Sequence, residues 1–135
     1  MKKLLVIVSI FAISIFTGCK SSVTGEVVSA QTEIKQVSVQ DASEAVKKEN
    51  IQFIDVRTVE EYQSGHAPKV VNIPLDTLEK ELSKLDKNKP VYVICQTGRR
   101  SQKGAEILQK QDFKQLYNII GGTSAWISAG LPTEK

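Results

Sequence analysis

The sequence predicts an α/β domain built around a five-stranded, mainly parallel sheet with helices on both faces. Short apolar runs alternate with amphipathic segments between residues 34 and 135, and turn or helix-capping residues separate them. Strands that alternate with helices are typical of βαβ units, whose right-handed crossovers make neighbouring strands parallel. A stretch of this length fits one domain with one core, because domains commonly hold about 100–150 residues.

Each expected strand is a short apolar run, and each is followed by a segment with helical features. The expected strands span residues 34–39, 51–56, 70–74, 91–95 and 115–120. The expected helices span residues 41–49, 58–64, 76–85 and 101–110, and a closing helical turn spans residues 124–130.

Local signals define several of the helix ends. Asp41 opens the pattern Asp-Ala-Ser-Glu, whose spacing is that of a capping box, so a helix is expected to begin there. Gly65 should end the helix of residues 58–64, because glycine readily adopts the conformations that terminate helices. Another capping pattern begins at Asp76, and three leucines follow it at helical spacing.

The strand of residues 91–95 ends in Cys95, and a polar loop follows it. The loop contains Gln96, Thr97, Gly98, Arg99, Arg100 and Ser101. Glycine breaks the strand pattern, and the arginines need solvent or an anion. We therefore expect Cys95 at the mouth of a site, since open α/β sheets bind ligands beyond the carboxyl ends of their strands. A buried, inert cysteine is the alternative.

This setting favours a reactive thiolate at Cys95. The backbone N–H groups of the loop lead into a helix expected to begin at Ser101, and a helix N-terminus favours negative charge. Such surroundings can lower the pKa of a thiol from about 8.5 to about 3.5–7.5. Arg99 and Arg100 add positive charge that cannot be titrated away. The expected chemistry is attack by the sulfur anion on an anionic substrate, without a metal or a cofactor.

His66 is the only histidine in the chain. A cysteine–histidine hydrolase would need this base oriented beside Cys95. A single histidine is a weak sign of such a pair, so a structural role for His66 is the favoured interpretation.

Three ordered blocks of the sequence resemble the rhodanese-like (sulfurtransferase) family. They are IDVRTVEEYQSGHAPKVVNIPL, CQTGRRS and GGTSAWISAGLP, and the similarity covers about residues 34–135. It implies the family's fold of five parallel strands with helices on both sides. It also implies the family's reaction, in which Cys95 takes the sulfane sulfur of a small anionic donor such as thiosulfate. The sulfur would travel as a covalent persulfide to a cyanide-like or thiol acceptor, a protein thiol included.

The resemblance also implies roles for individual residues. Cys95 would be the catalytic residue, and the donor would be bound by Gln96, Thr97, Gly98, Arg99, Arg100, Ser101 and Arg57. Asp55, His66 and Trp126 match structural positions of the family motifs. For Asp55 and Arg57 an ion pair is favoured over direct contact with substrate. Trp126 lies beside small residues, where a lone tryptophan most often belongs to the core.

Other functions fit the residues less well. Phosphatases with a related architecture need an arginine six positions after the cysteine, and Ser101 occupies that position. A thiol–disulfide oxidoreductase would normally show two cysteines separated by two residues, which this chain lacks. A non-catalytic or protein-partnered module, acting as a persulfide carrier or as a redox or binding partner in the cell envelope, remains the alternative to an enzyme.

Residues 1–18 look like a secretory signal peptide. Two lysines precede an uncharged apolar stretch that is short for a membrane span, and small residues follow it. Cys19 comes directly after Gly18 and resembles the lipobox of bacterial lipoproteins, which implies a lipidated cysteine at the mature N-terminus. An ordinary signal peptide with a coincidental cysteine is the alternative.

Residues 19–33 would then form a flexible tether, because they are rich in serine, threonine and glycine and have no helical period. These features predict a lipid-anchored protein of the cell envelope, on the periplasmic or extracellular face of a bacterial membrane. With Cys19 lipidated, Cys95 would be the only thiol. A disulfide between Cys19 and Cys95 requires the lipid prediction to be wrong.

The charge balance does not suggest a nucleic-acid partner. The chain has 18 lysines and arginines against 15 acidic residues, a formal net charge of +3. Removal of residues 1–18 takes away two lysines and no acid, so the charge falls to +1. A balance so close to zero does not provide a basic surface. We expect a monomer that touches the membrane only through its lipid.

Overall fold

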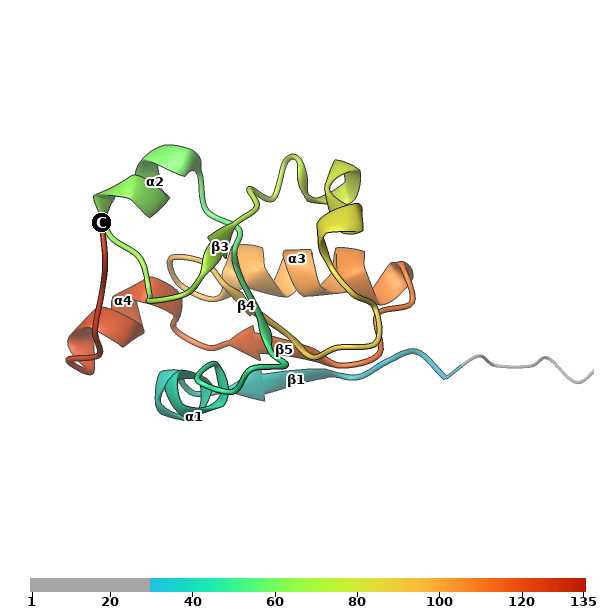
Figure 1. The fold of residues 1–135 in the computed structure, drawn as a ribbon, viewed down its shortest axis with the longest axis horizontal. Helices are drawn as coiled ribbons and strands as arrows, with labels where there is room; N and C mark the ends of the chain where they lie inside the picture. Colours follow the sequence, from blue (N-terminus) through green and yellow to red (C-terminus); the bar gives the residue numbers. More distant parts are fainter. Residues whose placement is uncertain (1–29) are drawn as a thin grey trace, which may run out of the picture.

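The computed structural model describes residues 30–135, which fold into an α/β domain (Figure 1). The expected signal peptide, Cys19 and most of the expected tether lie outside these residues and stay predictions. The five strands are β1 (Ile34–Val37), β2 (Gln52–Asp55), β3 (Val71–Asn72), β4 (Val91–Ile94) and β5 (Leu116–Ile119). They form one sheet in the order β1-β5-β4-β2-β3, and every pair of neighbouring strands is parallel. The predicted fold class is confirmed.

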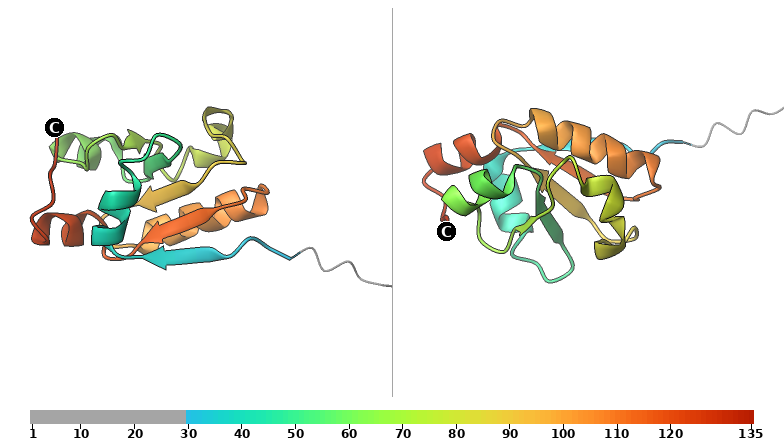
Figure 2. Two further views of the ribbon diagram at one scale, coloured as in Figure 1. Left: turned by 60° about the horizontal axis from the view of Figure 1, so that its bottom comes forward. Right: turned by 90° about the horizontal axis from the view of Figure 1, so that it is seen from above.

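Helices cover both faces of this sheet (Figure 2). The α-helices are α1 (Val39–Ala45), α2 (Val59–Ser64), α3 (Arg99–Lys110) and α4 (Gly122–Ser128), and two 3₁₀ helices are η1 (Leu78–Lys80) and η2 (Leu82–Lys84). Residues of α3 and η1 pack in one core cluster, and residues of α1 and α4 pack in the other. Among residues 30–135, none of the helices has the length and apolar character needed to cross a membrane.

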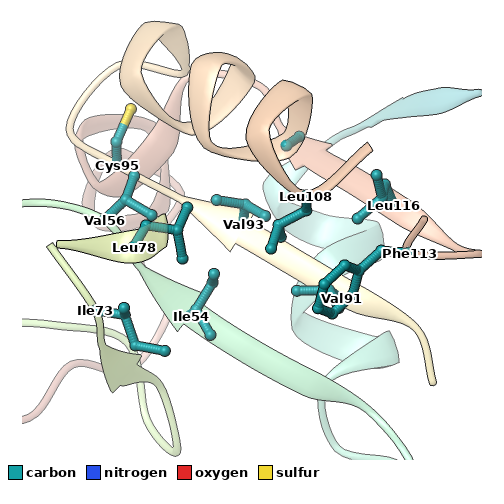
Figure 3. Packing of buried hydrophobic residues seen from close by; sticks show 11 residues of the cluster. Ile54, Val56, Ile73, Leu78, Val91, Val93, Cys95, Leu108, Phe113 and Leu116 are labelled. Carbon is teal, nitrogen blue, oxygen red and sulfur yellow. The ribbon is translucent and has the colours of Figure 1, made fainter. Parts of the chain in front are cut away.

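Strand β4 lies in the middle of the sheet and contributes to both clusters. Val91 and Val93 face the α3 side together with Cys95, whereas Tyr92 and Ile94 face the α1 and α4 side. Successive side chains of a strand point to opposite faces, so a strand buried on both sides is apolar throughout. Cys95 lies at one end of the α3-side cluster, with its sulfur directed away from the other core residues (Figure 3).

The predicted start of the first helix is wrong by two residues. The helix begins at Val39, and Ser38 is its N-cap, with its side chain accepting a hydrogen bond from the amide of Asp41 (3.1 Å). Serine is a preferred N-cap because its oxygen satisfies a free N–H group of the first turn. The earlier cap also shortens β1, which ends at Val37.

The predicted α-helix at residues 76–85 is also wrong, because this segment forms the two 3₁₀ helices η1 and η2. In a 3₁₀ helix, side chains three positions apart lie on one side. Leu82 and Leu85 therefore both pack against the cluster that contains the buried Leu78. By contrast, Gly65 does end α2 as expected, since its amide donates to the carbonyl of Tyr62 (3.2 Å).

Candidate functional site

The loop after β4 forms the candidate site at the carboxyl end of the sheet. Gly98 has a left-handed conformation (φ 98°) and is the N-cap of α3, which begins at Arg99 rather than at Ser101. Glycine adopts this conformation without the steric cost that other residues pay. The turn at Gly98 brings the chain back towards Cys95, so the loop encloses the sulfur. Both arginines consequently belong to the first turn of α3.

Cys95 is a free cysteine, and only 1% of its surface is exposed. The expectation that Cys95 lies at the mouth of a site and not in the core is therefore wrong as to burial, because Cys95 belongs to the α3-side core cluster. The reason is the tight loop, in which the amide of Gly98 donates to the Cys95 sulfur (3.1 Å) and Ser101 Oγ lies 3.3 Å from it. The sulfur is thus buried but surrounded by polar groups, unlike that of an inert core cysteine.

Two opposing influences act on the pKa of the Cys95 thiol. Burial raises it, whereas the Ser101 hydroxyl and the backbone amides of Ser101, Thr97 and Gly98 lower it. The net result is a pKa below the ordinary value for cysteine. This direction agrees with the sequence prediction. Hydrogen-bond donors that converge on a sulfur stabilise its anion, which is the nucleophilic form.

Ser101 connects the sulfur to a polar residue inside the sheet. Its hydroxyl donates to Asn118 Oδ1 (2.6 Å), and Asn118 Nδ2 donates to Gln36 Oε1 (2.8 Å) and to the carbonyl of Gly98 (3.2 Å). Asn118 lies in β5 and is nearly fully buried. Sequence analysis missed this residue, although a lone asparagine inside the apolar run QLYNII is an available signal. Asn118 holds both Ser101 and the loop backbone in place.

Ser101→Ala should raise the pKa of Cys95, because it removes a hydroxyl that accepts from the thiol in this structure and can turn its proton from Asn118 to the sulfur once the thiol ionises. We expect alkylation by iodoacetamide at pH 7 to slow by about five-fold, given about 1 kcal/mol for one hydrogen bond. The midpoint of the alkylation rate against pH should move upwards. Ser124→Ala is the matched control, since Ser124 accepts from the Gln96 side chain (2.8 Å) and not from the sulfur. An unchanged midpoint in Ser101→Ala would contradict the assigned role.

The loop is also held from the side of α4. Gln96 Nε2 donates to Ser124 Oγ, and the Thr123 amide donates to the Cys95 carbonyl (2.8 Å). Gly122 permits this approach, because a Cβ at its position would lie 2.3 Å from the Cys95 carbonyl oxygen. The resemblance includes this glycine, but only the tertiary structure explains why a side chain is excluded there.

The two arginines of the loop have different surroundings. Arg100 forms a bidentate ion pair with Glu61 of α2, and both nitrogen–oxygen distances are 2.7 Å. Arg99 lines an open groove of about 660 Å³ together with Thr97 and Lys103. Among residues 30–135, Arg99 has no ion-pair partner. Donor binding by either arginine remains a prediction, but only Arg99 presents an uncompensated charge.

Asp55 and Arg57 form the expected ion pair beneath the loop. Arg57 Nη2 lies 2.7 Å from Asp55 Oδ2, and both side chains are almost entirely buried. Arg57 also donates to Gln96 Oε1 (3.2 Å) and to the carbonyl of Gly65 (2.9 Å). The pair therefore links the end of β2 to the loop and to the end of α2. Contact between Arg57 and a donor stays a prediction.

The two aromatic positions singled out from the sequence have packing contacts. The His66 ring stacks on Tyr62 with ring centroids 3.7 Å apart, and its Nδ1 lies 2.8 Å from the Tyr62 carbonyl. Trp126 packs in the core beside Phe53, and its Nε1 donates to the Pro132 carbonyl (2.8 Å). These contacts favour the structural interpretation of both residues. Within residues 30–135 no cluster of His, Cys, Asp and Glu could hold a metal ion.

The family model of the rhodanese-like domain matches residues 38–129. Because the match covers well over half of the chain, this protein belongs to the rhodanese-like family. The matched range includes α2, the loop with Cys95 and the whole of α4.

Individual relatives and structures agree with this assignment. The chain is 39% identical over 92 residues to the thiosulfate sulfurtransferase GlpE of Coxiella burnetii, a span of 68% of this chain and 86% of that one. It is 38% identical over 96 residues to YrkF, a candidate sulfur carrier protein of Bacillus subtilis, covering 70% of this chain but only 52% of YrkF. A crystal structure of a rhodanese-like protein from Staphylococcus aureus matches with a TM-score of 0.64 and 32% identity, covering 69% of this chain and 91% of that one.

Proposed function

We propose that this protein is a sulfurtransferase that carries a sulfane sulfur as a persulfide on Cys95. The observation that supports it most directly is the cradle around the sulfur, where the Gly98 amide and the Ser101 hydroxyl lie within hydrogen-bond distance. A thiolate held in this way is a nucleophile that needs no separate base. The 39% identity to a thiosulfate sulfurtransferase supports the same reaction class.

The proposed reaction has two displacement steps. The Cys95 thiolate attacks the outer sulfur of a donor such as thiosulfate, the sulfur–sulfur bond of the donor breaks, and sulfite leaves with the bonding electron pair. An acceptor thiolate or cyanide then attacks the outer sulfur of the persulfide, and the Cys95 thiolate leaves. No external oxidant or reductant is needed. The loop amides that face the sulfur are placed to stabilise negative charge on it in both steps.

A dedicated sulfur carrier is the second candidate. With 1% of its surface exposed, Cys95 gives free thiosulfate little access in this structure. The chain is also similar to one domain-sized part of the candidate sulfur carrier YrkF. Such a carrier would accept persulfide sulfur from a protein or from glutathione persulfide and turn over thiosulfate poorly.

Intact mass spectrometry distinguishes these functions. The purified protein should gain one sulfur atom on incubation with thiosulfate, sulfite should appear in equal amount, and a reducing thiol should remove the added mass. A gain from glutathione persulfide but not from thiosulfate would favour the carrier. No gain from thiosulfate, glutathione persulfide or a protein persulfide would contradict both functions and leave a binding module.

A further inference from the structure

Glu61 compensates one of the two positive charges that the loop brings to the site. Its carboxylate and the Arg100 guanidinium lie 39 positions apart in the sequence, yet they are joined by two hydrogen bonds of 2.7 Å. About a third of each side chain is exposed, so the pair lies at the surface of the site rather than in the core. Bidentate carboxylate–arginine pairs fix geometry as well as charge.

The position of Glu61 is fixed independently of Arg100. Glu61 belongs to the capping box of α2, where its Oε2 accepts from the amide of Thr58 (3.0 Å) and its own amide donates to Thr58 Oγ1 (3.3 Å). The hydrogen bond from Arg100 lowers the pKa of Glu61 to about 2, against the opposing effect of burial. Glu61 is therefore ionised throughout the neutral range, and the pair carries no net charge.

The ion pair between Glu61 and Arg100 weakens the attraction of the site for an anionic donor. An oxyanion that uses Arg100 must compete with a carboxylate already held in place. An oxyanion that leaves the pair intact gains no net attraction from Arg100, because Glu61 neutralises its charge. Both effects grow with the charge of the donor, because Coulomb energy is proportional to it. Thiosulfate carries two negative charges, whereas a simple alkyl persulfide carries one.

We propose that Glu61 is a specificity-determining residue that keeps Arg100 from the donor and disfavours dianionic thiosulfate relative to singly charged persulfide donors. The inference rests on the proposed sulfurtransferase function and names the donor class of that site. Glu61 acts through Arg100 and does not touch the reacting sulfur. The positive charge left for the donor then comes from Arg99 and the loop amides.

Glu61→Gln separates the charge of this residue from its role in the helix. Glutamine is also accepted at this position of a capping box, so α2 should keep its start while the ion pair is lost. The matched control is Glu60→Gln, which removes the same charge from the same turn of α2. Glu60 is exposed and makes no ion pair with a described residue.

The measurement is kcat/KM for thiosulfate and for the persulfide of mercaptoethanol, whose only charge is on the reacting group. We expect Glu61→Gln to raise kcat/KM for thiosulfate about five-fold at low salt, mainly through KM, and to change the persulfide value less than about two-fold. High salt should reduce the difference, because mobile ions screen exposed charges. Glu60→Gln should leave the ratio of the two donors unchanged.

Equal changes for both donors, or the same ratio in Glu61→Gln and Glu60→Gln, would overturn the inference. Thiosulfate binding to the Cys95→Ser protein, measured by calorimetry with and without Glu61→Gln, keeps this result separate from the proposed function. Tighter binding with Glu61→Gln supports the role of Glu61 even if no donor yields a persulfide. Unchanged binding contradicts that role even if sulfur transfer is observed.

Discussion

Cys95→Ser should abolish sulfur transfer and leave the fold intact. Serine is similar in size to cysteine, so the buried site should accept it without a cavity or a clash. Its hydroxyl does not ionise near neutral pH and cannot form a persulfide. We expect the rate to fall below about one-thousandth of the wild-type value, the scale of loss when a catalytic nucleophile is removed.

The chain supplies its own matched control in Cys19, the other of its two cysteines. Cys19→Ser should transfer sulfur at the wild-type rate, because Cys19 is not part of the loop. Both variants are followed by sulfite release and by intact mass, with circular dichroism to verify folding. A sulfur atom gained by folded Cys95→Ser would show that another group carries it and that the proposed mechanism is wrong.

Asp55→Asn should cause the largest loss of stability among the expected results. The substitution keeps the shape of the side chain but leaves the Arg57 guanidinium buried without its counter-charge. Breaking a buried ion pair by removing one partner costs about 3–5 kcal/mol, because the remaining charge stays desolvated. We expect the free energy of unfolding, measured by urea denaturation, to fall by about this amount. The loop should also loosen, since Arg57 donates to Gln96.

Glu44→Gln provides the comparison at an exposed ion pair. Glu44 lies 2.7 Å from Lys47, but both side chains are more than half exposed. Water and salt screen such a pair, and the urea midpoint should therefore hardly change. If Asp55→Asn unfolded at the same urea concentration as Glu44→Gln, the buried pair would not have the stabilising role assigned to it here.

The strands and α2 could be predicted because their signals are local. Each strand is a short apolar run, and the five expected runs all contain observed strands. The segment from Thr58 to Gly65 carries both helix ends within eight residues, as a capping box and a C-terminal glycine. Such features depend on hydrogen bonds between near neighbours in the chain, so they can be inferred without knowledge of the fold.

Other helix boundaries were predicted wrongly, because the sequence allows more than one helix start or more than one type of helix in these segments. Ser38 and Asp41 are both good N-cap residues, and the chain uses the serine. The leucines after Asp76 fit an α-helical period, but the segment forms two 3₁₀ helices, which also pack these leucines in or against the α3-side core cluster. Similarly, α3 begins at Arg99 because Gly98 takes up the left-handed conformation that starts the helix.

The sequence by itself determined the α/β fold, the family resemblance and the position of Cys95 at the end of a strand before a polar loop. These follow from residue type, periodicity and short spacings. Tertiary structure alone decided that Cys95 is buried, that Ser101 is linked to Asn118, and that Arg100 is paired with Glu61. Ser101 and Asn118 are 17 positions apart and Arg100 and Glu61 are 39 apart. Contacts of this kind arise only when the crossovers bring separate strand ends and helix starts to one edge of the sheet, which no local pattern records.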